Sequence, residues 1–128
     1  MLRLVTLNLN GIRSAANKGW LPWVESIGAN CMGVQELKAQ AQDVTNRFDV
    51  IDGMKGHFHF AERKGYSGVG VYSRKKPSAV VTGIGNAEFD AEGRWVEARF
   101  DTARRRSVSI SSVSSISDKL RPRGSSRV

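Results

Sequence analysis

Apolar and polar residues alternate over residues 2–10, LRLVTLNLN, and this period of two predicts a β-strand with one buried face. Its apolar side consists of Val5, Leu7 and Leu9. Its other side consists of Leu4, Thr6, Asn8 and Asn10. We expect the strand to end at Gly11, because glycine punctuates strands and marks turns.

The pattern then changes to helical spacing, with apolar residues at Trp20, Trp23, Val24 and Ile27. Pro22 is compatible with a first helical turn, and Gly28 is a stop signal. Both tryptophans are expected to pack in the core rather than to form a stacking platform. The apolar run CMGV, residues 31–34, predicts a second strand. Strand, helix and strand form a right-handed βαβ unit if the two strands are parallel.

Five more short strands are expected, separated by Gly, Lys and Pro. They are FDVIDG (48–53), FHF (58–60), SGVGVYSR (67–74), SAVVTGIG (78–85) and RWVEARF (94–100). Residues 40–48 predict a weak helix. This mixture predicts an α/β or α+β fold with a sheet at its centre, and 128 residues are enough for one such domain.

Serine and arginine dominate the chain after residue 106. Val108, Ile110 and Val113 could continue one strand, but the remaining sequence offers too little apolar surface to order itself. We therefore predict one domain over residues 1–113, followed by a Ser/Arg-rich, disordered tail over residues 114–128.

The formal net charge is +8, and the last 28 residues contribute +5 of it, so a polyanionic partner is predicted mainly by the tail. Cys31 has no partner for a disulfide within the chain, and its apolar neighbours predict a small buried thiol rather than a reactive one. The sequence shows no signal-peptide pattern and no apolar stretch of about 18 residues. We therefore expect a cytoplasmic location without membrane association.

Polar side chains follow both strands of the predicted βαβ unit. Asn8 and Asn10 close the first strand, and Gln35 and Glu36 follow the second. Ligands gather beyond the carboxyl ends of parallel strands, and a carboxylate with amides suits a hard cation such as Mg²⁺. By itself, however, a glutamate after a strand is more often the solvated start of a loop.

Other candidate motifs favour no particular chemistry. His57 and His59 share one strand face but have no third metal ligand nearby in the sequence. The segment GYSGVG lacks the Gly-Lys-Ser/Thr ending of a nucleotide-binding P-loop. The basic segments RKGY and SRKKP are expected to be solvated loops, or to neutralise phosphates if they border a DNA site.

Four motifs occur together in one order: VTLNLNGIRSA, VQELKAQ, GYSGVGVYSR and AEFDAEGR. Over about residues 1–106 the chain thereby resembles the exodeoxyribonuclease III family of apurinic/apyrimidinic (AP) endonucleases, within the endonuclease/exonuclease/phosphatase superfamily. The resemblance implies the N-terminal half of a four-layer α/β sandwich, in which two sheets pack face to face with helices outside. It also implies a bacterial DNA repair nuclease that uses Mg²⁺ or Mn²⁺ to hydrolyse phosphodiester bonds of double-stranded DNA at abasic sites and 3′ ends.

The resemblance implies roles for six residues. Glu36 corresponds to the metal-ligating carboxylate, and Asn8 to a catalytic amide near the metal and the scissile phosphate. Asn10 corresponds to a residue on or next to the metal. The residues implied to contact DNA are Arg13, in the loop after the first strand, Lys38 and Tyr66. Lys38 is also implied to lie near the metal site and to help orient its acidic groups. Without the resemblance, Tyr66 would be interpreted as an ordinary turn aromatic.

The chain departs from the family after the EGR motif. The family has a Tyr-Phe-Pro-Ser-Gly segment where this chain has VSSISD, with Ser114 at the place of the tyrosine. Later Gly-Asp-x-Asn and Ser-Asp-His motifs are absent. We therefore expect the second sheet to be mostly missing and the inner face of the first to be exposed. A complete protein would be a monomer, whereas this chain is expected to associate and to have little or no activity.

Two other functions stay open from the sequence. The first is a non-catalytic nucleic-acid-binding protein that uses Arg13, Tyr66 and the basic tail; its binding would weaken steeply with salt. The second is a superfamily relative that hydrolyses phospholipids or inositol phosphates. The GYSGVG and LKAQ segments favour the DNA repair branch by resemblance.

Overall fold

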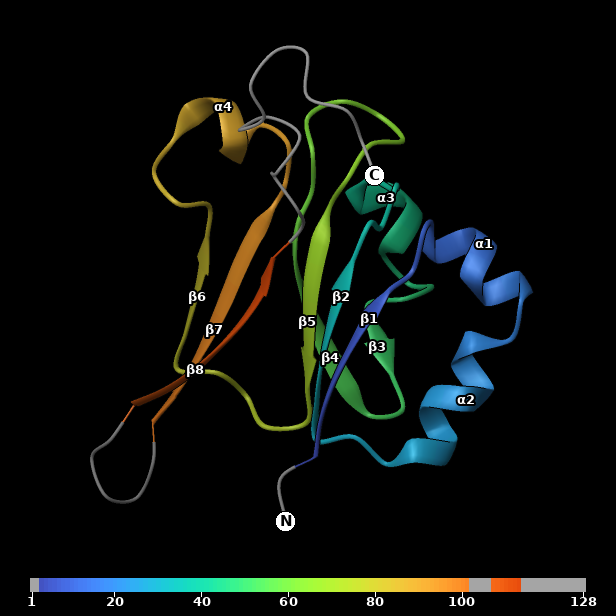
Figure 1. The fold of residues 1–128 in the computed structure, drawn as a ribbon. Helices are drawn as coiled ribbons and strands as arrows, with labels where there is room; N and C mark the ends of the chain where they lie inside the picture. The colour runs from blue at the N-terminus through green and yellow to red at the C-terminus, as the bar shows by residue number, and fades with distance from the viewer. Residues whose placement is uncertain (1–2, 102–106, 114–128) are drawn as a thin grey trace, which may run out of the picture.

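Two β-sheets pack face to face, and helices cover the outer face of the larger one (Figure 1). The computed structural model describes residues 3–101 and 107–113. The tail predicted over residues 114–128 lies outside the described residues, so its predicted disorder stays a prediction. None of the described helices combines the length and hydropathy needed to cross a membrane.

The larger sheet has the strand order β1-β2-β5-β4-β3. Its strands are β1 (Leu4–Asn8), β2 (Cys31–Gln35), β3 (Val50–Ile51), β4 (Met54–His59) and β5 (Val69–Ser73). β1 and β2 pair in parallel, and the other neighbours pair antiparallel. The predicted parallel pair is therefore confirmed, and the intervening chain crosses the sheet as a helical connection.

Three helices lie against the larger sheet: α1 (Ile12–Asn17), α2 (Trp20–Ile27) and α3 (Ala41–Val44). α2 ends as predicted at Gly28, whose φ of 59° is easily adopted by glycine. Trp20 is buried, but Trp23 is 45% exposed, so the expectation that both pack in the core is wrong for Trp23. The loop predicted after β1 is also wrong: Arg13 lies in α1, a helix too short to leave a periodic pattern.

The smaller sheet consists of β6 (Ala79–Thr82), β7 (Trp95–Asp101) and β8 (Ser107–Val113), all antiparallel; α4 (Ala87–Asp90) lies between β6 and β7. The apolar layer between the sheets consists of Cys31, Val69, Val71, Val96, Ala98, Phe100 and Ile110. The expectation that the inner face of the first sheet is exposed is therefore wrong, because three strands of the second sheet are present and cover it.

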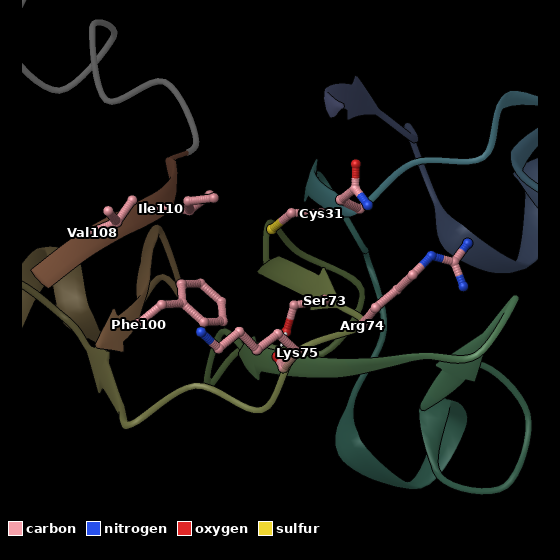
Figure 2. A pocket seen from close by; sticks show the side chains of 8 residues that line it. Cys31, Ser73, Arg74, Lys75, Phe100, Val108 and Ile110 are labelled. Carbon is pink, nitrogen blue, oxygen red and sulfur yellow. Dashed lines mark hydrogen bonds between the residues drawn. The ribbon is translucent and has the colours of Figure 1, made fainter. Parts of the chain in front are cut away.

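A cavity of about 280 Å³ remains at one end of this layer. Figure 2 shows Cys31 from the larger sheet facing Phe100 and Ile110 from the smaller one across the gap. Cys31 is 3% exposed, and burial raises the pKa of its thiol to about 11. The predicted small buried thiol is thereby confirmed.

Candidate active site at the carboxyl ends of β1 and β2

Three of the sequence motifs meet beyond the carboxyl ends of β1 and β2. Backbone N–H groups of Gly11 and Ile12 donate to the carbonyl oxygens of Glu36 (2.8 Å) and Leu37 (2.9 Å). On the other side, Lys38 N–H donates to the carbonyl oxygen of Ser67 (2.8 Å). The segment 36–38 is therefore held between the loop after β1 and the GYSG loop before β5.

This edge contains four non-glycine residues with a left-handed backbone, at Asn10 (φ 47°), Glu36 (φ 52°), Lys38 (φ 50°) and Ser67 (φ 43°). A side chain in this region costs roughly 1–2 kcal/mol per residue. The surrounding hydrogen bonds hold these conformations in place. Such local strain is typical of binding and catalytic sites, where the fold fixes side chains in otherwise unfavourable positions.

The two asparagines of β1 and its loop are already engaged with each other and with Lys38. Asn8 Oδ1 accepts a hydrogen bond from the backbone N–H of Asn10 (3.0 Å). Lys38 Nζ donates to Asn10 Oδ1 (2.6 Å). The structure therefore brings together three of the residues that the sequence assigned to this site.

Glu36 is the acidic group of this edge. Its side chain is half-buried, and among residues 3–101 and 107–113 no hydrogen bond or ion pair holds its carboxylate. Gln35, which the sequence also placed here, turns instead between the sheets. Its Nε2 donates to Ser112 Oγ (3.0 Å), and Ser112 Oγ donates to the Val34 carbonyl oxygen (2.8 Å). Sequence reasoning missed Ser112, because nothing in a serine-rich segment distinguishes one buried serine.

The donor set fits a cation that needs few protein ligands. Glu36 supplies one carboxylate and Asn8 one amide oxygen, which suits Mg²⁺ or Mn²⁺ because these ions retain water and accept phosphate oxygens. Asn10 Oδ1 is engaged with the Lys38 ammonium, so its predicted use as a ligand requires that this bond be exchanged. No cluster of three or more His, Cys, Asp or Glu side chains suited to a metal occurs among the residues that the structure describes.

Arg13 borders the site through contacts within the protein. Its Nη2 donates to the Lys38 carbonyl oxygen (3.1 Å), and its Nη1 lies 3.6 Å from Asp43 Oδ1. Asp43 in turn accepts from the backbone N–H of Gln40 (3.0 Å) at the start of α3. Arg13 is therefore oriented next to Lys38, with about half of its side chain exposed to solvent.

Tyr66 lies in a second basic group on the same rim. Arg94 Nη2 donates to the Tyr66 hydroxyl (2.8 Å), and the guanidinium carbons of Arg94 and Arg63 lie 5.5 and 5.8 Å from its ring centroid. Arg94 also pairs with Glu92 (2.6 Å). Sequence reasoning named Arg63 only as part of the basic RKGY segment and gave Arg94 no role, although Arg94 ends the AEFDAEGR motif.

Gln40 fixes the loop that carries Arg63 and Tyr66. Its side-chain Nε2 donates to the carbonyl oxygens of Ala61 (3.0 Å) and Arg63 (3.2 Å). The signal for Gln40 was present in the VQELKAQ motif, but its partners lie more than 20 residues away and could not be read from spacing.

Comparison with known proteins agrees with this geometry. The model of the Endonuclease/Exonuclease/phosphatase family matches residues 5–127. The chain is 32% identical over 100 residues to a DNA-(apurinic or apyrimidinic site) endonuclease of Dictyostelium discoideum, covering 78% of this chain and 27% of that protein. It is 32% identical over 101 residues to an exodeoxyribonuclease of Bacillus subtilis (strain 168), covering 78% and 39%.

Solved structures show the same partial coverage. The catalytic domain of Xenopus laevis APE2 superposes with a TM-score of 0.65 and 25% identity, over 84% of this chain and 42% of that one. The AP endonuclease LMAP of Leishmania major superposes with a TM-score of 0.72 and 21% identity, over 88% and 40%, and shows the likeness of fold. The mixed α/β fold predicted from the sequence is therefore confirmed as part of the fold of AP endonuclease catalytic domains. The chain belongs to the endonuclease/exonuclease/phosphatase family, is similar to its AP endonuclease and exodeoxyribonuclease members, and spans less than half of the length of those relatives.

Proposed function

We propose that this chain forms the Glu36 side of the active site of a metal-dependent DNA phosphodiesterase that acts at abasic sites and 3′ ends. The observation that carries this proposal is the Glu36 carboxylate, half-buried and without a partner among the described residues, on a strained segment between two polar loops. The names of the similar proteins, an AP endonuclease and an exodeoxyribonuclease, support DNA as the substrate class.

In this proposal Glu36 and Asn8 hold Mg²⁺ or Mn²⁺. A bound divalent cation neutralises charge that develops on the phosphoryl group during hydrolysis. Lys38 keeps the Asn10 amide in position, with its ammonium 2.6 Å from Asn10 Oδ1. Arg13 and the Tyr66–Arg94 group lie on the rim, where cations can contact backbone phosphates and position the duplex without reading its sequence.

We further propose that the 128-residue chain alone has little or no turnover. Hydrolysis requires a group that activates or aligns the attacking water in addition to the cation. Glu36 is assigned to the cation, and both histidines of the chain lie on β4, which is separated from β2 by β5. The Nδ1 of His59 lies 2.8 Å from the Trp95 carbonyl oxygen. The matched structures are more than twice as long as the segment that this chain covers, which leaves room for the groups that complete such a site.

Substitution of Glu36 tests the proposed cation site. We expect Mn²⁺ binding to the wild-type chain, measured by calorimetry, and a loss of affinity of about ten-fold or more in Glu36→Gln, because the carboxylate is the principal charged ligand. Glu25→Gln is the matched control: it removes the same charge from an exposed position on α2 and should leave Mn²⁺ affinity unchanged.

The same variants distinguish the nuclease from a non-catalytic nucleic-acid-binding protein, which the basic rim also favours. Binding to abasic duplex should weaken steeply with salt in either case. If Mn²⁺ does not bind, or binds equally to Glu36→Gln, while duplex binding persists, the cation-dependent proposal is wrong and the binding role stands. Rapid cleavage of abasic duplex by the 128-residue chain, abolished by Glu36→Gln, would contradict only the proposed lack of turnover.

A further inference from the structure

A pocket of about 480 Å³ that is bordered by basic side chains lies at the opposite end of the larger sheet from Glu36. β5 pairs with β2 so that Val69 lies beside Gln35, near the site, and Ser73 lies beside Cys31, at the other end. The residues that line it come from β4, the connection from β5 to β6, and β6. Figure 1 shows where these segments lie in the fold. Its lining contains Lys55, His57, Arg74, Lys75 and Lys76, and no Asp or Glu.

Some of the basic side chains of this pocket already form hydrogen bonds or ion pairs within the protein, and others do not. Arg74 pairs with Asp52 (2.6 Å), and Figure 2 shows its side chain directed away from that of Lys75. Lys75 Nζ reaches the Asp101 carbonyl oxygen at 3.2 Å. Lys55 and Lys76 are exposed, and no side-chain hydrogen bond or ion pair is formed by either within the described part of the chain. Two ammonium groups are therefore available to a ligand.

His57 lines the same pocket with its imidazole ring. Its Nε2 is buried and has no hydrogen-bond partner in the described structure. Desolvation by burial, and then the nearby charge of Lys55, lower the pKa of His57. His59, two residues along the same strand, differs because its Nδ1 lies 2.8 Å from the Trp95 carbonyl oxygen. The Nε2 of His57 is therefore without a hydrogen-bond partner in the described structure, whereas the ring of His59 has one in the Trp95 carbonyl oxygen.

Among the described residues that line the pocket, no acidic side chain offsets this charge at His57, and Asp52, in the turn before β4, is paired with Arg74. Within the pocket, β5 and the connection after it contribute Arg74, Lys75 and Lys76, and β6 contributes only Ala79 and Val80. On β7, Glu97 and Arg99 alternate with the buried Val96 and Ala98 and pair with each other on the opposite face.

We propose that this pocket binds the phosphate group of a small phosphate monoester, with the ammonium groups of Lys55 and Lys76 as its donors and the imidazole of His57 beside them. A dianionic phosphate matches the two cations, and the apolar Pro77 and Val80 that line the same pocket can contact the ester's apolar part. The volume is in the range of small-ligand sites. This site is independent of the function proposed at Glu36.

NMR of the two histidine side chains tests the proposal directly. The chain contains only His57 and His59, so two imidazole signals are expected, and His57→Gln assigns them. Adenosine 5′-monophosphate is the probe, and adenosine, which lacks the phosphate, is its control. We expect the monophosphate to raise the pKa of His57, because an anion stabilises the imidazolium, and to leave that of His59 nearly unchanged. Adenosine should change neither.

Charge-removing variants show whether binding is local. Lys55→Gln and Lys76→Gln should each weaken binding of the monophosphate by about five-fold, whereas Lys18→Gln, an exposed lysine outside the pocket, should not. An unchanged His57 pKa, an equal response to adenosine, or equal weakening by Lys18→Gln would each overturn the proposal. Because the three lysines are exposed, their substitution leaves the core intact, and His57→Gln is needed only to assign the two imidazole signals.

Discussion

At the scale of single residues, Lys38 links the parts of the candidate site. Its N–H donates to Ser67, its carbonyl accepts from Arg13, and its ammonium donates to Asn10. Each contact reaches a different segment: the GYSG loop, α1 and the loop after β1. The sequence assigned Lys38 to the DNA-contacting residues, and that role stays a prediction. The sequence also predicted that Lys38 orients the acidic groups of the site; the structure shows its ammonium on the Asn10 amide, which loss of the ammonium would release.

Cys31 makes the stability of the protein depend on pH in the alkaline range. Its pKa in the folded state is about 11, above its value in an unfolded chain, because burial disfavours the thiolate. The unfolded state therefore releases the thiol proton at lower pH than the folded state, so Cys31 makes stability fall as the pH rises between about 9 and 11. The free energy of unfolding, measured in urea across this pH range, should fall as the pH rises, and this fall should be smaller in Cys31→Ala.

The Cys31 prediction also has a kinetic form. A thiol reagent such as dithionitrobenzoate should react slowly with the folded protein and rapidly in denaturant, because the thiolate is the reactive species and the side chain is 3% exposed. Equal rates in both conditions, or an unchanged alkaline dependence in Cys31→Ala, would show that Cys31 is accessible and not buried between the sheets.

At the scale of elements, the turn after α4 depends on the absence of a side chain at Gly93. Its φ is 61°, and an added Cβ would lie 2.4 Å from the Ala61 backbone nitrogen. This close approach positions Arg94 next to Tyr66. We expect Gly93→Ala to lower the free energy of unfolding, measured in urea, by about 3 kcal/mol or more, because the strain of the backbone and a steric clash add.

Gly85→Ala is the matched control for Gly93→Ala. Gly85 also has a positive φ, 86°, but an added Cβ would meet no atom within 4 Å. It should therefore cost only the backbone strain, roughly 1–2 kcal/mol. If the two variants lose equal stability, the close approach of Gly93 to the chain at Ala61 does not contribute, and the turn is defined by backbone conformation alone.

Sequence reasoning found the elements that have a long enough pattern. β1 was predicted because its alternation continues over several residues, although Asn10 falls beyond the strand's end at Asn8. α1 and α4 were missed because six and four residues are too few to show a helical period. Glu36 could be found because it follows an apolar strand. The Gln35–Ser112 bond joins residues 77 apart, and spacing in the sequence cannot reveal it.

At the scale of the whole molecule, the smaller sheet ends in a strand with a free edge. In the part of the chain that the structure describes, β8 pairs with β7 and has no partner on its other side. Its exposed apolar residues, Val108 and Val113, are 44% and 46% accessible. The predicted association was based on an uncovered inner face, but that face is covered. An unpaired edge is a different physical reason for the same behaviour.

We therefore predict that the chain self-associates through β8, and that Ser111→Lys weakens this association. Ser111 is exposed in the middle of β8, so the variant adds charge at the edge without removing a core contact. In an antiparallel pair of β8 strands the two added lysines would repel each other, and the dimer dissociation constant should rise by about five-fold. Light scattering coupled to size-exclusion chromatography over a concentration series measures it.

Trp23→Lys separates pairing at the edge from general apolar attraction. Trp23 is a larger exposed apolar side chain than any on β8, at 45% exposure, but it lies on α2 and not at a strand edge. Edge pairing predicts that Trp23→Lys leaves the dissociation constant unchanged while Ser111→Lys raises it. The reverse result would place the contact on the helical layer and leave β8 without a role. A chain that stays monomeric at every concentration would contradict the prediction outright, because a free β8 edge would then be insufficient for self-association.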